Sequence, residues 1–196
     1  MQPDEESALV RAVAAGDRDA FRRLVQSHQR PLLAFARRML QDPAQAEDVV
    51  QETLLRLWSR AARFEPGRAR LTTWLHNIAR NLCIDVLRRQ QREPGADAGG
   101  DRGNCRHGDP PVDRADENAD GNPVHREERE RLARRVQSLL AALPERQRSA
   151  LVLCHYQGFS NREASEILEL SVDALESLLA RARRTLKKEL NADHAD

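Results

Sequence analysis

The residues that could bind a metal ion or take part in redox chemistry are few and scattered. The 196-residue chain contains three cysteines and six histidines. Cys105 and His107 lie two positions apart, and Cys154 and His155 are adjacent, but this spacing matches no zinc-ligand pattern. We therefore expect no metal and no cofactor. A sensing role for Cys105 and His107 stays open.

Catalytic motifs are also missing. The sequence has no glycine-rich phosphate loop, no HExxH pair and no Gly-x-Ser-x-Gly elbow. The neighbouring carboxylates Glu47 and Asp48 fall on the polar face of an expected helix, which is typical of a solvated or partner-binding surface rather than of an acid/base pair. The sequence predicts that the protein is not an enzyme and has no catalytic residues.

The most informative arrangement of polar residues lies near the C-terminus. A short helix over about 161–168, a turn and an amphipathic helix over about 172–190 have the spacing of a helix-turn-helix. Small polar residues at the start of the second helix can approach base edges in a major groove, and basic residues in its last turns can meet phosphates. The predicted DNA-contacting residues are Ser171, Asp173, Ala174, Ser177, Arg181, Arg184 and Lys187.

The elements that must position these residues are helices. Residues 1–90 show no strand-like alternation and few β-branched residues. Asp17 and Asp42 are expected helix N-caps, with Pro43 at the first position of the second of these helices, and helical spacing resumes after Pro31. The C-terminal block is helical too, and its first apolar stripe is Leu132, Val136, Leu139, Leu140 and Leu143.

Residues 91–125 differ from both flanks. They hold six of the nine glycines and four of the nine prolines, and they bury too little apolar surface to offset the entropy of ordering. The net charge is +4 over residues 1–90, −4 over 91–125 and +1 over 126–196, which gives the total of +1. We therefore predict an all-α protein of two small helical domains, 1–90 and 126–196, joined by a flexible acidic linker.

The overall composition narrows the possible partners and the location. No apolar stretch is long enough to span a membrane and the acidic N-terminus is not a signal peptide, so we expect a cytoplasmic protein without direct membrane insertion. A net charge near zero predicts weak DNA affinity for the free protein, because few phosphates are neutralised.

Four segments of the chain carry a recognisable pattern; in chain order they are Asp48–Trp58 (DVVQETLLRLW), Leu71–Arg89, Leu143–Arg148 and Ser160–Arg184. These segments resemble the sigma-70 family of RNA polymerase sigma factors, in particular its extracytoplasmic-function (ECF) group. The resemblance covers about residues 17–90 and 126–190. In that family they correspond to the helix that binds core polymerase, to the helix that melts and reads the −10 element, and to the −35-reading domain.

The resemblance implies an alternative sigma factor that binds core RNA polymerase, directs it to two-part promoters and helps to open the −10 region. Its implied partners are core polymerase, promoter DNA (duplex at −35, single-stranded at −10) and an anti-sigma factor, which could hold it at the membrane. The implied polymerase-binding residues are Asp48, Gln51, Glu52 and Arg56. The implied −10 residues are Arg63, Arg68, Arg70, Asn77, Arg80, Asn81 and Arg88.

The chain departs from the family pattern at three positions. Glu169 stands in the helix-turn-helix turn where glycine is usual, and a left-handed backbone there costs on the order of 1 kcal/mol. Glu176 and Leu178 replace basic residues of the recognition helix, which removes phosphate contacts.

The two tryptophans have a structural role in this prediction. Trp58 and Trp74 are expected to be core residues that pack the helices flanking the loop 63–72.

Two other interpretations remain open at this point. The chain could be a helix-turn-helix regulator that binds duplex DNA alone, although the polar face around Asp48 and Arg56 argues for a protein partner. It could also be a sigma-like adaptor that only binds an anti-sigma protein. Binding to core polymerase and in vitro transcription distinguish the three.

Overall fold

The computed structural model describes residues 3–67, 69–92 and 123–192, and these residues form helices and connecting turns without a strand. This confirms the predicted all-α class. Cys105, His107 and Arg68 lie outside the described residues, as does most of the predicted linker. The elements are α1 (Pro3–Ala14), α2 (Arg18–Leu40), α3 (Pro43–Arg60), η1 (Ala61–Arg63), α4 (Leu71–Arg92), α5 (Pro123–Ala142), α6 (Glu145–Leu151), η2 (Val152–Tyr156), α7 (Asn161–Leu168) and α8 (Val172–Ala192).

Local capping explains where the first helices begin. The Asp17 carboxylate accepts hydrogen bonds from the backbone N–H groups of Asp19 and Ala20, and Asp42 does the same at the start of α3, where Pro43 opens the helix. Both predicted caps are confirmed. Pro31 lies inside α2 without ending it, because the helix buries one continuous apolar face on both sides of the proline.

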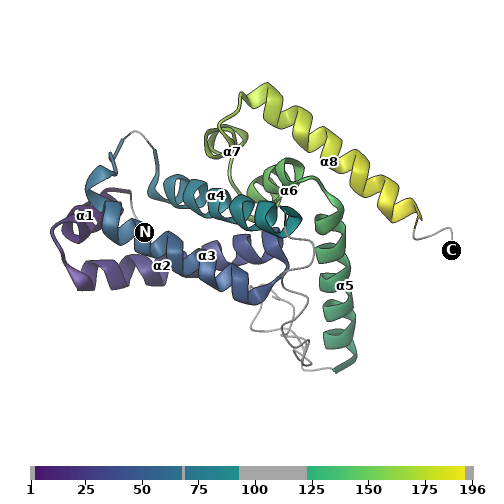
Figure 1. The fold of residues 1–196 in the computed structure, drawn as a ribbon, viewed down its shortest axis with the longest axis horizontal. Helices are drawn as coiled ribbons and strands as arrows, with labels where there is room; N and C mark the ends of the chain where they lie inside the picture. Colours follow the sequence, from purple (N-terminus) through teal and green to yellow (C-terminus); the bar gives the residue numbers. More distant parts are fainter. Residues whose placement is uncertain (1–2, 68, 93–122, 193–196) are drawn as a thin grey trace.

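Helices α1 to α4 form a bundle around α2. Phe35 of α2, Leu57 of α3 and Leu75 of α4 are fully buried at its centre. The long α4 begins at Leu71 and continues to Arg92, so it ends inside the segment 91–125 that was predicted as linker. As Figure 1 shows, α4 lies between the first bundle and the C-terminal helices, so it can present residues to both.

Helices α5 to α8 form the second part of the molecule. The apolar stripe of α8 is buried at Leu175, Leu179 and Ala182, but Leu132 at the other end of this part is 62% exposed. The prediction that Leu132 belongs to the core is therefore wrong. The N-terminal part of α5 extends away from the other helices (Figure 1), so the apolar stripe is covered only near the end of α5, around Leu140 and Leu143.

The two parts pack directly against each other. Helix α7 lies on α4, while α5, α6 and η2 contact α2 (Figure 1), and the buried apolar residues of both parts form one contiguous cluster. The guanidinium of Arg148 on α6 donates hydrogen bonds to the carbonyl oxygens of Met39, 2.5 Å away, and of Ala141. None of the described helices is long and apolar enough to cross a membrane.

Candidate nucleic-acid and polymerase interfaces

The residues predicted to bind polymerase share one face of α3. Asp48 and Gln51 are exposed, while Glu52 and Arg56 are half-buried. The Arg56 Nε donates to a Glu52 carboxylate oxygen over 2.8 Å. This pairing holds both side chains along the helix surface, so all four residues form one polar face.

This face borders a groove of about 680 Å³ between α3 and α4. Asp48, Glu52 and Arg56 line one wall, and Leu82 and Val86 of α4 provide apolar lining. A groove with an apolar lining and a charged edge suits a helix of a partner protein, because it offers both buried area and orienting charges.

The sequence analysis missed an apolar neighbour of this face. Leu55 is 60% exposed, four residues after Gln51 and three before Trp58, which is 36% exposed. Trp58 packs edge-on against Phe21 of α2, with ring centroids 5.2 Å apart, but its exposure shows that the prediction of a core residue is wrong. The available signal was that Leu55 falls outside the buried stripe of α3.

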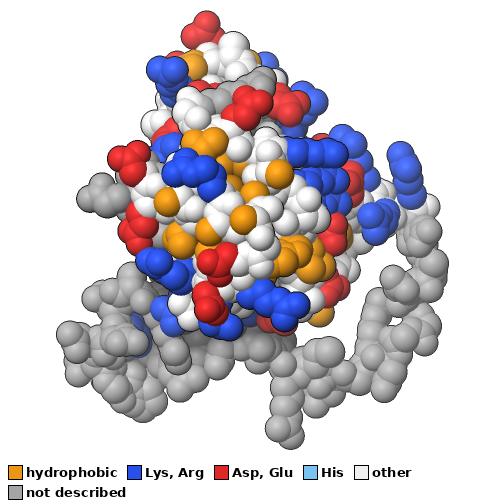
Figure 2. All heavy atoms as spheres, turned by 90° about the vertical axis from the view of Figure 1, so that its left-hand side faces the viewer, with side chains coloured by type: hydrophobic (Ala, Val, Ile, Leu, Met, Phe, Trp, Pro, Cys, Tyr) orange, Lys and Arg blue, Asp and Glu red, His pale blue; other side chains and the backbone are white. Residues whose placement is uncertain are grey.

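Figure 2 views the molecule from the side of α1. Hydrophobic side chains gather near the middle of this face, and side chains of Lys or Arg and of Asp or Glu are mixed around them. This mixture agrees with the near-zero net charge of the chain. A surface of this kind is more typical of a protein-binding face than of one that grips duplex DNA through phosphates.

The predicted −10 residues lie on the loop after η1 and along α4. Arg63, Arg70, Asn81 and Arg88 are exposed. Trp74 is half-buried and packs against Phe64 with a centroid distance of 5.7 Å, as predicted for a residue that supports the loop. A cavity of about 320 Å³ opens beside the loop. Its lining includes Phe64, Gly67 and Arg70 from the first part and Glu166 from α7.

Some of these side chains already have partners in the second part of the molecule. The Asn77 amide donates to the carbonyl oxygen of Ile167 over 3.3 Å, and Arg70 pairs with Glu163 at 3.1 Å. Burial lowers the pKa of Arg80, and the nearby carboxylate of Glu169 opposes this shift. The side of α4 that carries the predicted −10 residues therefore faces α7.

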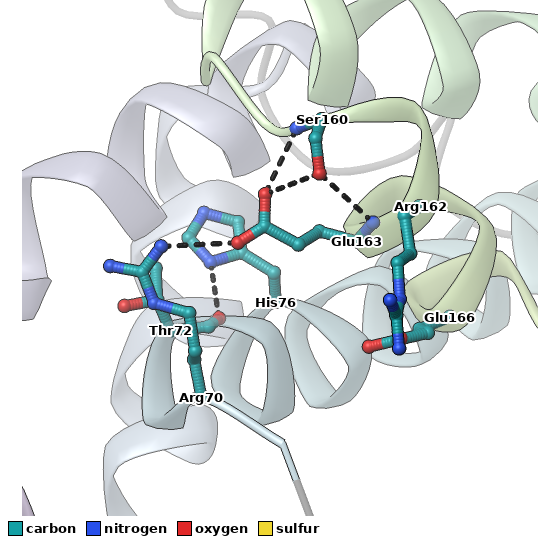
Figure 3. A network of polar contacts seen from close by, with 7 residues as sticks. All are labelled: Arg70, Thr72, His76, Ser160, Arg162, Glu163 and Glu166. Carbon is teal, nitrogen blue, oxygen red and sulfur yellow. Dashed lines mark hydrogen bonds and ion pairs between the residues drawn. The ribbon is translucent and has the colours of Figure 1, made fainter. Parts of the chain in front are cut away.

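His76 is buried where the two parts meet. Its ring packs edge-on between Phe35 of α2 and Phe159, which precedes α7, at centroid distances of 5.5 and 4.8 Å. The Nδ1–H group donates to the carbonyl oxygen of Thr72 over 2.8 Å (Figure 3). Burial lowers the pKa of His76 to about 4, so the ring is neutral at pH 7.

The helix-turn-helix has the predicted local structure. Ser160 and Glu163 form a capping box at the start of α7 (Figure 3), and the hydrogen bonds from Ser160 lower the pKa of Glu163. Ser171 accepts a hydrogen bond from the N–H of Ala174 at the start of α8. Glu169 in the turn has φ of 55°, so it occupies the left-handed region expected for this position.

The predicted −35 residues form one outward face of α8. Six of the seven are exposed, and Ala174 is half-buried. Of the two departures in this helix, Glu176 is exposed and accepts a hydrogen bond from Asn161, whereas Leu178 is half-buried against the core. Leu178 therefore contributes to packing, whereas Glu176 is an exposed acidic residue beside the predicted DNA-contacting face, which itself includes Asp173.

A helix with a polar face beside an apolar groove, followed by a helix-turn-helix, is typical of a transcription factor that has both protein and DNA partners. Comparison with known families gives the specific class. Residues 24–93 match the family model for sigma-70 region 2, and residues 133–186 match the model for sigma-70 region 4. The chain belongs to the sigma-70 family, in its ECF group of alternative sigma factors, which direct RNA polymerase to promoters and are transcription regulators rather than catalysts.

Individual relatives agree with this assignment. The ECF sigma factor SigM of Mycobacterium tuberculosis is 32% identical, over 93% of this chain and 83% of its own length. SigK of Mycobacterium ulcerans is 29% identical over 96% of this chain and 95% of its own length. The probable sigma factor RfaY of Xanthomonas campestris is 33% identical over 90% of this chain, which spans only 42% of RfaY.

Two solved structures are similar in fold. CnrH in complex with the cytosolic domain of CnrY matches with a TM-score of 0.69 and 28% identity, over 96% of this chain and 99% of CnrH. The sigma factor RpoE of Bartonella quintana, in complex with the anti-sigma factor NepR, matches with a TM-score of 0.61 and 25% identity, over 88% of this chain and 98% of RpoE.

Proposed function

We propose that this protein binds core RNA polymerase through α3, brings it to two-part promoters and stabilises the opened −10 region. Residues 1–90 act as the polymerase-binding and −10 domain, 126–196 as the −35 domain, and 91–125 as the tether between them. The observation that carries this proposal is the polar face of α3, which borders a groove shared with the −10-reading helix α4. In this proposal, protein binding and strand opening lie on adjacent helices.

Polymerase docking uses the face formed by Asp48, Gln51, Glu52 and Arg56. The groove between α3 and α4 receives a helical element of the polymerase, and the exposed side chain of Leu55 extends the apolar contact. Apolar contact provides most of the affinity of such an interface, while the charged edge fixes the orientation of the partner.

Opening of the −10 region requires no bond-breaking chemistry. The cavity beside the loop, lined by Phe64 and Arg70, holds an unpaired base, and arginine and amide groups of α4 follow the strand. A base that stacks on a protein side chain regains roughly 1–3 kcal/mol of the energy lost on unstacking. The protein therefore acts by stabilising melted DNA and is not an enzyme.

Recognition of the −35 element uses the outward face of α8. Its N-terminal residues, including Ser171 and Ser177, approach base edges, and Arg181, Arg184 and Lys187 contact phosphates. Two weak DNA contacts in one chain raise the effective concentration of each at a bipartite promoter.

We further propose that an anti-sigma protein controls this factor in the cytoplasm and can hold it at the membrane. Support comes from the two similar structures, in which CnrH is bound to CnrY and RpoE to NepR. The groove between α3 and α4 offers such a partner the same surface as it offers polymerase, so the two would compete.

The first test is binding of the full chain to core polymerase. The pair Asp48→Ala and Gln51→Ala should weaken binding about tenfold or more, since it removes two exposed polar contacts of roughly 1 kcal/mol each. The matched control pair, Asp19→Ala and Gln26→Ala, changes the same residue types at exposed positions of α2. Equal affinity of all three proteins would contradict the assignment.

The second test is run-off transcription with core polymerase on a genomic template library. A specific transcript that depends on this protein supports the sigma function. Absence of any specific transcript contradicts it and leaves the adaptor, whereas tight duplex binding without polymerase binding indicates a stand-alone regulator.

A further inference from the structure

We propose that Glu176 is a specificity-determining residue of the −35 domain, and that it reads the N4 amino group of a cytosine in the major groove. This inference rests on the proposed function, because it names the base that one residue of α8 recognises. It explains the acidic residue at position 176 as a change of sequence preference rather than as the loss of a contact.

The start of α8 carries no positively charged side chain. Residues 172–180 contain two acids, Asp173 and Glu176, and no Lys or Arg, so Arg181 is the first cation of the helix. In a helix-turn-helix the N-terminal residues of the recognition helix contact base edges, while basic residues further along meet phosphates. The base-reading side chains of α8 therefore offer acceptors, a hydroxyl group and apolar surface, but no cationic donor.

Glu176 lies on an exposed face of α8, the helix at the outer edge of the molecule in Figure 1. It follows Asp173 by three positions and precedes Ala180 by four, so these exposed residues are neighbours along one side of the helix. Leu178 is half-buried against the core and does not belong to this face. Of the two departures in α8, only the acidic one therefore changes what the helix presents to DNA.

The first helix of the motif orients the Glu176 carboxylate. The Asn161 amide, at the start of α7, donates to the Oε1 atom of Glu176 over 3.2 Å. Within the described part of the chain, the Oε2 atom has no hydrogen-bond partner and Glu176 forms no ion pair. One oxygen is thus held by the protein while the other can accept a hydrogen bond from DNA, and a side chain fixed in advance loses less entropy on binding.

Cytosine has the major-groove edge that suits a carboxylate best. Its N4 amino group donates a hydrogen bond, and the neighbouring C5–H group has no lone pair. Adenine also donates through N6, but its N7 acceptor lies beside that group and repels a carboxylate, while guanine presents only the acceptors O6 and N7. The basic residue usual at this position in the family suits guanine, so Glu176 reverses the preference within the same base pair.

The first experiment takes a promoter found by the run-off assay, randomises its −35 region and selects the duplexes that core polymerase binds with the full chain. The variants are Glu176→Gln and Glu176→Lys. The matched control is Glu189→Gln, the same change at an exposed position in the last turns of α8. Circular dichroism checks that every variant keeps its helices.

We expect the wild type and the control to select cytosine at one position of the −35 element. Glu176→Gln should change the preference at that position to adenine, because a glutamine amide bonds both N6 and N7. Glu176→Lys should change it to guanine, whose two acceptors suit a cation. A substitution that merely disturbed the fold would weaken binding without exchanging one base for another.

The second experiment removes the amino group from the DNA. Pyrimidin-2-one, a cytosine analogue without N4, replaces the selected cytosine, and duplex affinity is measured for the wild type and for Glu176→Ala. The wild type should lose about tenfold or more in affinity through the missing hydrogen bond to a charged group. Glu176→Ala should lose much less, and the difference between the two losses isolates the contact from any effect of weaker base pairing.

An unchanged base preference in Glu176→Gln and Glu176→Lys would overturn the inference, as would equal losses of the two proteins on the analogue. Stronger binding of Glu176→Lys to all duplexes by the same factor would show that residue 176 meets phosphates, which also contradicts it. In each of these cases a specific transcript from the wild type leaves the proposed sigma function intact. Absence of any transcript contradicts the function itself, and the inference falls with it.

Discussion

Replacement of Glu169 by glycine should stabilise the protein. Glu169 ends α7 with φ of 55°, and the N–H of Leu170 donates to the Ser165 carbonyl oxygen, which is the hydrogen bond of a Schellman motif. The turn therefore requires a left-handed residue at this position, and glycine adopts that conformation without the steric cost of a Cβ atom.

The expected gain is the difference between two opposing effects. A residue with a Cβ loses about 1–2 kcal/mol in the left-handed region. Glycine loses roughly 0.5–1 kcal/mol through the greater freedom of the unfolded chain. The net stabilisation is then about 0.5–1 kcal/mol, which corresponds to an increase in melting temperature of roughly 1–4 °C for a chain of this size.

Urea and thermal unfolding followed by circular dichroism measure this change against two controls. Glu169→Gln keeps the Cβ atom but removes the charge near Arg80, so it should leave stability nearly unchanged. Glu176→Gly makes the same substitution inside α8 and should destabilise by about 1 kcal/mol. If Glu169→Gln stabilises as much as Glu169→Gly, the charge and not the backbone is responsible and the reasoning is refuted.

Three further predictions concern the two cores and their junction. Ser160→Ala should cost about 1 kcal/mol of unfolding free energy and raise the pKa of Glu163, because it removes the hydroxyl hydrogen bond that lowers this pKa most; an unchanged NMR titration of the Glu163 carboxyl would contradict this. Because burial lowers the pKa of His76 to about 4 from 6.5, the folded state binds fewer protons than the unfolded state between these values. Stability should therefore fall by about 2 kcal/mol between pH 7 and pH 5, and His76→Phe should flatten that part of the unfolding-versus-pH curve; an equally steep curve in the variant would count against it. Phe35→Ala should cost about 3–5 kcal/mol in urea unfolding because the ring is fully buried, and a loss under 1 kcal/mol would show that the site is not tightly packed.

The features that the sequence predicted well are those set by neighbours along the chain. The caps at Asp17 and Asp42 depend on a side chain and the N–H groups two or three residues later, so residue type and spacing are enough to identify them. The left-handed turn at Glu169 follows in the same way, from the short interval between two amphipathic helices.

The features that the sequence did not predict depend on contacts between distant segments. Arg148 looks like a surface residue in a polar helix, but its guanidinium is buried on the Met39 carbonyl oxygen, an acceptor that every residue possesses and that leaves no pattern in the sequence. Leu132 shows the opposite error, because helical spacing places it on an apolar stripe, whereas none of the described residues buries its side chain at the start of α5. The direct packing of α7 on α4 also depends on contacts between distant segments, and the sequence did not predict it.

The hydrogen bond from Arg148 to Met39 joins residues 109 positions apart, which has a consequence for synthesis of the chain. At roughly 5–20 residues per second, a ribosome needs on the order of 5–20 seconds to add the intervening residues. During that interval the first four helices can fold with nothing over α4. Each newly made molecule thus passes through a period in which the side of α4 that carries the predicted −10 residues is uncovered, before the second part emerges from the ribosome.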